Sequence, residues 1–172
     1  NDHLYSIQQT LDNDYVCAGF SSSGISVDKT EACLGAEDYW IVKLDSVGNI
    51  LWQSAIGGNS SDQLSSIQVC NDSGFICIGS SFSDVSGSKT EDLIGNDSRA
   101  DIWIVKLDET GSLLWQNDIG GNKYDYISEV HQTTDGGYIC GGTSASNISG
   151  DKTENIYGYY AYWIIKLDSL GN

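Results

Sequence analysis

The stretch DYWIVKLDSVGNILWQ, residues 38–53, decides the fold of this 172-residue chain. It returns as DIWIVKLDETGSLLWQ at residues 101–116, and its first part returns as AYWIIKLDSLGN at residues 161–172. The first tryptophans of the three copies are separated by 63 and 60 positions. A fixed period within one chain indicates a repeat architecture. The stretch is therefore predicted to be a building block of the fold and not an active-site motif.

Four strands are predicted in each unit, because β-branched and aromatic residues dominate these segments and alternate with polar ones. The predicted first strands are 3–11, 63–70 and 126–133, the second are 15–21, 75–81 and 138–144, and the third and fourth of the first unit are 39–45 and 49–56. Turns rich in Asp, Asn and Gly join the first strand to the second. A long polar loop ending in KTE leads to the third strand. No segment has a helical period.

The predicted fold class is all-β and of the β-propeller type, with three four-stranded antiparallel blades of about 60 residues each. The units are 1–60, 61–123 and 124–172 of a single segment, and the third unit lacks its last strand. A β-solenoid would have a shorter repeat without hairpin turns, and a sandwich would not need such strict repetition. Because propellers typically have four to eight blades, we expect an open segment of a larger array, or half of a ring that another chain completes.

The hairpin between the third and fourth strands has the spacing Asp45-x-x-Gly48-x-x-x-Trp52. The Asp is expected to accept hydrogen bonds from turn amides, and the Gly to allow a left-handed turn. The Trp is then expected to lie across the neighbouring blade and bury a large apolar area. The residues predicted to be structural on this basis are Trp40, Trp52, Trp103, Trp115, Trp163, Asp45, Asp108, Asp168, Gly48, Gly111 and Gly171.

This hairpin resembles the tryptophan-docking repeat of quinoprotein-type propellers, in which the motif is part of the scaffold. The spacing here has one residue fewer between Asp and Gly, and no cofactor constellation accompanies it. These departures argue against a quinone enzyme.

A closer resemblance covers nearly the whole chain. Its motifs are SGDKTEN at 149–155, DYWIVKLDS at 38–46, IGGN at 56–59, SIQQT at 6–10 and DGGYI at 135–139. Together they are similar to the repeat arrays of secreted or cell-surface β-propeller proteins of Bacteroidota. Those proteins are often exported by type IX secretion with a C-terminal sorting domain. The resemblance implies an extracellular propeller without a settled enzymatic role.

The composition limits the partners. The formal net charge is -16, and this acidity opposes binding to nucleic acid phosphates and to anionic lipid. No run of about 18 apolar residues is present, so no segment is predicted to insert into a membrane.

Of the five cysteines, Cys17, Cys77 and Cys140 occupy equivalent repeat positions, which lie too far apart for disulfides. One bridge between Cys33 and Cys70 remains open from the sequence.

Candidate binding residues lie in the long loops at 22–37, 82–100 and 145–161, which differ more between units than the strands do. The tyrosines suit stacking on sugars or proteins, with blade packing as the alternative. The acidic residues would take Ca²⁺ if they formed a ring with Asp2, Asp62, Asp125 and Glu91. The candidate binding residues are Tyr157, Tyr159, Tyr160, Tyr162, Asp28, Glu31, Asp151 and Glu154.

The six repeated lysines are expected to pair with local carboxylates, with a ligand contact as the alternative for Lys29 and its equivalents. No catalytic residue and no cofactor is assigned from the sequence. The one metal considered is Ca²⁺ at the acidic residues named above. The expected function is a non-enzymatic, extracellular repeat module for adhesion, ligand binding or structural assembly at a bacterial cell surface. Its partners would be a protein, a glycan or copies of itself. The alternative is part of a glycan-active or quinone-type propeller enzyme whose catalytic residues lie outside this segment.

Overall fold

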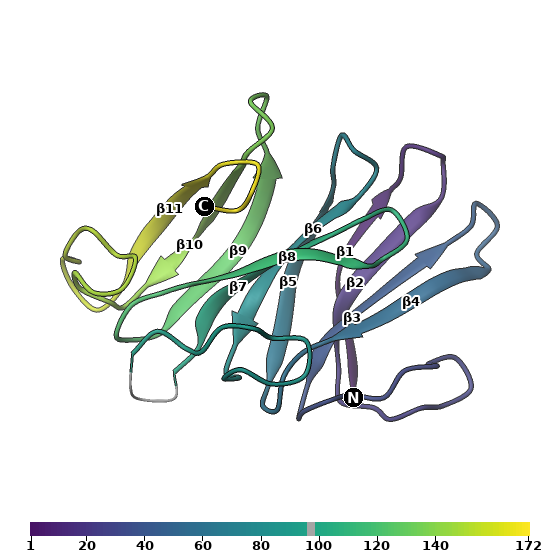
Figure 1. Ribbon diagram of the computed structural model, residues 1–172, viewed down its shortest axis with the longest axis horizontal. Coiled ribbons are helices and arrows are strands. Elements are labelled where there is room, and N and C mark those ends of the chain that lie inside the picture. Colours follow the sequence, from purple (N-terminus) through teal and green to yellow (C-terminus); the bar gives the residue numbers. More distant parts are fainter. Residues whose placement is uncertain (96–98) are drawn as a thin grey trace.

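The computed structural model describes residues 1–95 and 99–172, and all regular structure within them is β-strand (Figure 1). Three antiparallel sheets of four, four and three strands stand side by side (Figure 1). The predicted all-β architecture of open, propeller-like blades is therefore confirmed. The described residues contain no helix long and apolar enough to cross a membrane.

Each sheet is a meander in which consecutive strands are hydrogen-bonded neighbours. The first sheet consists of β1 (Asp2–Gln9), β2 (Tyr15–Ser21), β3 (Asp38–Leu44) and β4 (Ile50–Ile56). The second consists of β5 (Asp62–Val69), β6 (Phe75–Ser81), β7 (Asp101–Leu107) and β8 (Leu113–Ile119). The third consists of β9 (Asp125–Gln132), β10 (Tyr138–Ser144) and β11 (Ala161–Leu167).

The first strand ends earlier than predicted, because the chain turns back at Thr10. The Thr10 amide donates to the carbonyl of Asp14 at 2.9 Å, and Asn13 takes the left-handed conformation at φ 69°. Ser73 and Gly136 occupy the same place in the second and third sheets, with φ 64° and 82°. Asn and Gly adopt this conformation readily, whereas Ser73 is a rarer choice.

The strand-three to strand-four hairpin has the same geometry in every sheet. The Asp45 carboxylate accepts hydrogen bonds from the amides of Val47 and Asn49 at 2.9 and 2.8 Å. The Asp108 and Asp168 carboxylates bind the amides two and four residues ahead in the same way. The glycines of this turn have positive φ values of 93°, 83° and 89° at Gly48, Gly111 and Gly171.

Two apolar clusters join the sheets face to face. Between the first and second sheets, Val16, Ala18, Tyr39 and Ile41 are buried against a surface that includes Trp103. The cluster between the second and third sheets includes Ile76, Ile78, Ile102, Ile104, Ile127, Val130, Tyr138 and Cys140. The second sheet thus presents one face to the first sheet and the opposite face to the third.

The tryptophans of the fourth strands extend this contact between sheets. The Trp52 ring on β4 packs edge-on against Phe75 of the second sheet, with 5.7 Å between ring centroids. The Trp115 ring on β8 packs in the same way against Tyr138 of the third sheet, at 5.8 Å. The third-strand tryptophan Trp103 faces the opposite way and packs on Tyr39 of the first sheet at 5.0 Å.

Candidate functional site

The long loops lie at one end of the three sheets, and the tight hairpin turns lie at the other (Figure 1). The first loop follows β2, the second follows β6 and the third follows β10. In the second loop, residues 96–98 lie outside the described residues. The loop end is where the sequence places the candidate binding residues.

The four candidate tyrosines do not form one cluster. Tyr157 and Tyr159 project from the third loop and are 97% and 91% exposed. Tyr160 precedes β11, whereas Tyr162 lies within β11 at the repeat position of the buried Tyr39. Tyr162 therefore belongs to a sheet face, whereas Tyr157 and Tyr159 extend from the loop into solvent.

A second aromatic group at this end was not predicted. Tyr124 and Tyr126 stack with 5.8 Å between centroids and 6° between ring planes. The Arg99 guanidinium lies over the Tyr124 ring at 5.4 Å, a cation–π geometry. The signal in the sequence was two tyrosines separated by one residue, which places both on the same side of an extended chain.

The candidate acidic residues differ in their hydrogen bonds and in their exposure. The Glu31 carboxylate accepts from the amide of Ala55 at 2.6 Å, and that of Asp151 accepts from the amide of Gly120 at 3.1 Å. Asp28 and Glu154 are exposed. Within residues 1–95 and 99–172, no group of three or more His, Cys, Asp or Glu side chains is arranged to hold a metal ion.

Asp62 and Asp125 are buried, and their hydrogen bonds stabilise the end of the sheets that carries the long loops. Asp62 accepts hydrogen bonds from the hydroxyls of Ser81 and Ser83 at 2.5 and 2.9 Å and from the amide of Gly58 at 2.6 Å. Asp125 accepts from the equivalent glycine amide, that of Gly121, at 2.7 Å. These bonds fix the connection between one sheet and the next, and the Oδ1 atom of Asp125 is buried without a hydrogen-bond partner among the described residues.

The first residues of β3 and β7 are also buried aspartates. Asp38 accepts from the amides of Leu34 and Gly35, and its Oδ1 atom is buried without a hydrogen-bond partner. Burial raises the pKa of Asp38, and it raises the pKa of Asp101 to about 8. Asp101 therefore stays protonated well above the pH range in which an exposed aspartate ionises, and the pKa of Asp38 is shifted in the same direction.

The lysines of the loops are buried below the loop surface. Lys29, Lys89 and Lys152 each lie over the third-strand tryptophan of their own sheet, at 5.8, 5.8 and 5.1 Å from the ring centroid. Lys89 also forms a buried ion pair with Asp118. These contacts place the three ammonium groups inside the loop and away from any external ligand.

The prediction of a carboxylate partner was wrong for Lys29. Its ammonium donates to the carbonyls of Ser23 and Glu31 at 3.1 and 2.6 Å. The reason is a difference between the repeats, because Ala55 stands where the second sheet has Asp118. Backbone carbonyls of the loop replace the missing carboxylate.

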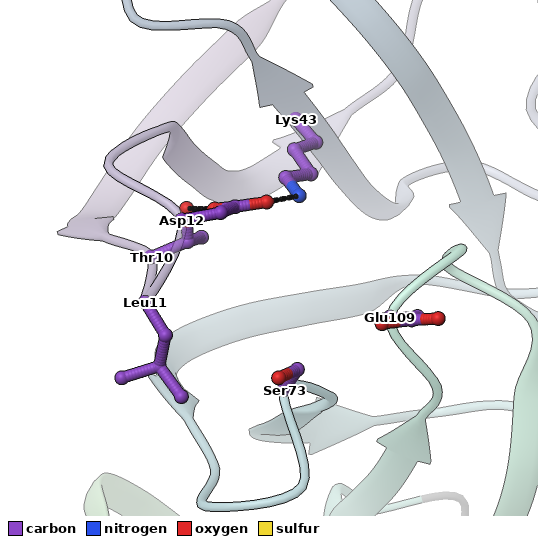
Figure 2. A pocket seen from close by; sticks show the side chains of 6 residues that line it. All are labelled: Thr10, Leu11, Asp12, Lys43, Ser73 and Glu109. Carbon is purple, nitrogen blue, oxygen red and sulfur yellow. Dashed lines mark hydrogen bonds and ion pairs between the residues drawn. The ribbon is translucent and has the colours of Figure 1, made fainter.

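The opposite end of the sheets carries a pocket of about 260 Å³ between the turns of the first and second sheets (Figure 2). Lys43 enters it and forms ion pairs with Asp12 at 2.8 Å and Asp14 at 3.6 Å. Figure 2 shows Glu109 on the other side of the pocket, apart from this pair. The pairs of Lys106 with Asp72 and Lys166 with Asp135 repeat the arrangement at 2.9 Å each. An ion pair found in every sheet is a scaffold feature.

The five cysteines are free thiols, so no bridge joins Cys33 and Cys70. The Cys33 thiol donates to the carbonyl of Ser21 at 2.9 Å within the first loop. Burial raises the pKa of Cys140 to about 12, and it raises the pKa of Cys77 further. These buried thiols are protonated and pack as small apolar groups.

A scan of the sequence against protein-family models found no match, and a search of the curated proteins likewise found none.

Proposed function

We propose that this chain is a non-enzymatic repeat module for structural assembly, which joins to further copies of itself through the outer faces of its first and third sheets. Its location on a bacterial cell surface is part of the proposal and rests on the resemblance of the repeat motifs. The observation that carries the proposal is that both outer faces repeat the residues of the buried faces inside the molecule.

The outer face of the third sheet is apolar at the positions that are buried in the other sheets. Tyr162 and Ile164 are 82% and 62% exposed, whereas their repeat equivalents Tyr39 and Ile41 are both 0% exposed. Ile139, at the position of the buried Val16, is also exposed. Three large apolar side chains on one sheet face constitute an exposed patch of the kind that marks an interaction site.

The outer face of the first sheet provides the complementary surface. Leu4 and Ile7 are exposed, although their equivalents Leu64 and Ile67 are buried against the preceding sheet. An apolar hollow of about 290 Å³ lies on this face, and its lining includes Leu4 and Trp40. Trp40 is the equivalent of Trp103, which packs on Tyr39 inside the molecule.

The Tyr162 face of the third sheet therefore repeats the first-sheet side of the internal contact between the first and second sheets. The Leu4 face of the first sheet repeats the second-sheet side of the same contact. The partner that fits the Tyr162 face is the Leu4 face of a second copy. Such a contact is heterologous, so copies would add head to tail and form either a closed ring or an open filament.

The experiment is sedimentation of the 172-residue chain over a wide range of concentrations. We expect association to grow with concentration, and the substitutions Tyr162→Asp and Leu4→Asp each to abolish it by placing a charge in an apolar contact. Tyr157→Asp, on an exposed loop tyrosine, is the matched control and should associate like the parent chain.

A mixture of the two variants tests the head-to-tail geometry. Each variant retains one intact face, so Tyr162→Asp and Leu4→Asp chains should form a one-to-one complex although each is monomeric alone. A parent chain that stays monomeric at every concentration would contradict the proposal. So would association that survives in either variant alone.

The exposed loop tyrosines Tyr157 and Tyr159 support adhesion as a second candidate function. Their rings are available for stacking on a protein or a glycan. Binding to a panel of cell-surface glycans that Tyr157→Ser and Tyr159→Ser together abolish would support this role.

A further inference from the structure

Lys89 of the second loop and Asp118 of β8 form an ion pair that is closed off from solvent. The Nζ atom of Lys89 contacts Oδ2 of Asp118, and the two side chains are 0% and 1% exposed. β8 is the outer strand of the second sheet (Figure 1). The pair therefore joins the loop to a strand at the sheet edge, at a place where the two groups are hidden from water.

Hydrogen bonds on both sides of the pair hold the loop and the strand in place. The side-chain oxygen of Gln116 accepts from the amide of Thr90 at 3.2 Å, and its amide group donates to the carbonyl of Ser88 at 2.6 Å. The Glu91 carboxylate accepts from the amide of Asp118 at 2.8 Å. The amine and the carboxyl group are thus kept in contact by the fold itself, and such fixed pairs of groups react as if at an effective concentration of about 10⁵ M or more.

The surroundings of the pair give little support to two charges. The Oδ1 atom of Asp118 is buried without a hydrogen-bond partner among the described residues. Within residues 1–95 and 99–172, Asp118 is also the one hydrogen-bond acceptor of the Lys89 ammonium. The Lys29 ammonium, by contrast, donates to two backbone carbonyls. Buried charges are costly unless their hydrogen-bonding capacity is met, so transfer of one proton to give a neutral amine and a neutral acid is favoured here.

The electrostatics of Asp118 agree with this geometry. Burial raises the pKa of Asp118 to about 7 against the opposing effect of Lys89, and the charges of Glu91 and Asp62 act in the same direction as burial. A protonated carboxyl group can be attacked by an amine and can lose its hydroxyl group as water. A carboxylate in solvent resists the same attack because of its charge.

We infer that Lys89 and Asp118 become joined by an isopeptide bond in the folded chain, through condensation of the two side chains. The ammonium first passes one proton to the carboxylate. The Nζ atom then attacks Cγ of Asp118, the new N–C bond forms and one C–O bond breaks, and the hydroxyl group leaves with an amine proton as water. The exclusion of solvent protects the amide product from hydrolysis. This modification site goes beyond the proposed function, because it acts within a single chain.

The other lysines of the first two sheets lack one of the required features. Lys29 has no acid beside it, because Ala55 stands at the position of Asp118. Lys43 has Asp12 as a partner, but that carboxylate is 56% exposed. We therefore expect a cross-link at Lys89 and none at Lys29 or Lys43.

The test is the intact mass of the 172-residue chain, measured in denaturant after prolonged incubation of the folded chain at neutral pH. We expect a mass that is lower than the sequence mass by one water molecule. After proteolysis, tandem mass spectrometry should find the peptide that contains Lys89 joined to the one that contains Asp118. Lys89→Met and Asp118→Ala should each have their full mass, whereas the matched control Lys43→Met should lose one water like the parent chain.

A parent chain that keeps its full mass would overturn the inference, and this measurement needs no variant to fold. Loss of water that persists in Lys89→Met would also overturn it, because an aspartate can lose water by cyclising on its own backbone. A link from Lys43 to Asp12 would contradict the argument from burial. Since denaturant separates copies of the chain, the result is independent of whether copies assemble.

Discussion

The ring of Trp52, on the first sheet, lies against the turn of the second sheet at Gly111, where an added Cβ atom would meet the ring at 2.8 Å. Trp115 stands in the same relation to Gly171 of the third sheet. The turn of the first sheet at Gly48 has nothing within 4 Å of the same position. Each turn glycine thus receives the tryptophan of the preceding sheet wherever such a sheet is present.

Replacing Gly111 by alanine should destabilise the chain more than replacing Gly48 by alanine. Both substitutions strain a positive φ, at a cost of about 1 kcal/mol each. Only Gly111→Ala also forces the Trp52 ring away, which adds about 1–3 kcal/mol. Urea denaturation of both variants measures the difference, and equal losses would contradict the tryptophan contact.

Removal of the inter-sheet tryptophans should be costly. Trp52→Ala and Trp115→Ala are each expected to lower the free energy of unfolding by about 3–5 kcal/mol, because a large ring leaves an apolar contact. Val47→Ala, at an exposed turn position, is the control and should change it by less than about 0.5 kcal/mol. Thermal and urea unfolding both report this, and a tryptophan variant as stable as the control would refute it.

The buried and the partly exposed lysine ion pairs should contribute different amounts to the free energy of unfolding. Lys89→Met leaves Asp118 buried without its partner and should cost about 3–5 kcal/mol at a pH where Asp118 is ionised. Lys43→Met removes a pair whose acceptor Asp12 is half exposed, and it should cost less than about 1 kcal/mol. The comparison is made by urea unfolding at pH 8. Similar costs for both would show that burial of the Lys89 pair does not matter.

Stability should fall as pH rises through the neutral range. Burial raises the pKa of Asp101 to about 8, so between about pH 4 and pH 8 the folded state holds a proton that the unfolded state has lost. The folded state is favoured at the acid end of that window, and the advantage disappears as pH rises through the folded pKa.

The substitution Asp101→Asn tests the origin of this dependence. Its amide oxygen can still accept from the Ile94 amide, which binds the Asp101 carboxylate at 2.5 Å, and it carries no charge. We expect a flatter profile of unfolding free energy against pH, with the largest gain above pH 8. A variant profile parallel to that of the parent chain would assign the effect to other groups.

The repeat made the strands, the turn and the role of Trp52 predictable, because each is set by local pattern and by turn chemistry that recurs along the chain. The burial of Asp38 was not predictable, since it depends on the close approach of Gly57 from β4's end. The partner of Lys29 was readable in principle, because aligning Ala55 with Asp118 shows that one carboxylate is missing.

Tyr162 shows the limit of reasoning from composition. Its place in a tyrosine-rich stretch suggested ligand binding, whereas its repeat position, that of Tyr39, places it on a sheet face. The aromatic pair Tyr124 and Tyr126 was missed for a related reason. Their approach to Arg99 requires the second loop and β9 to meet, which no local pattern states.

The placement of the lysines affects the long-range interaction between two copies of the molecule. Six of the seven lysines are held in loops or in ion pairs, so the outer surface of a chain with net charge -16 is left strongly negative. Two such particles repel one another until added salt shortens the range of their fields, which is about 8 Å at physiological ionic strength. Attraction between copies would therefore strengthen with salt, the reverse of what contacts between opposite charges would give.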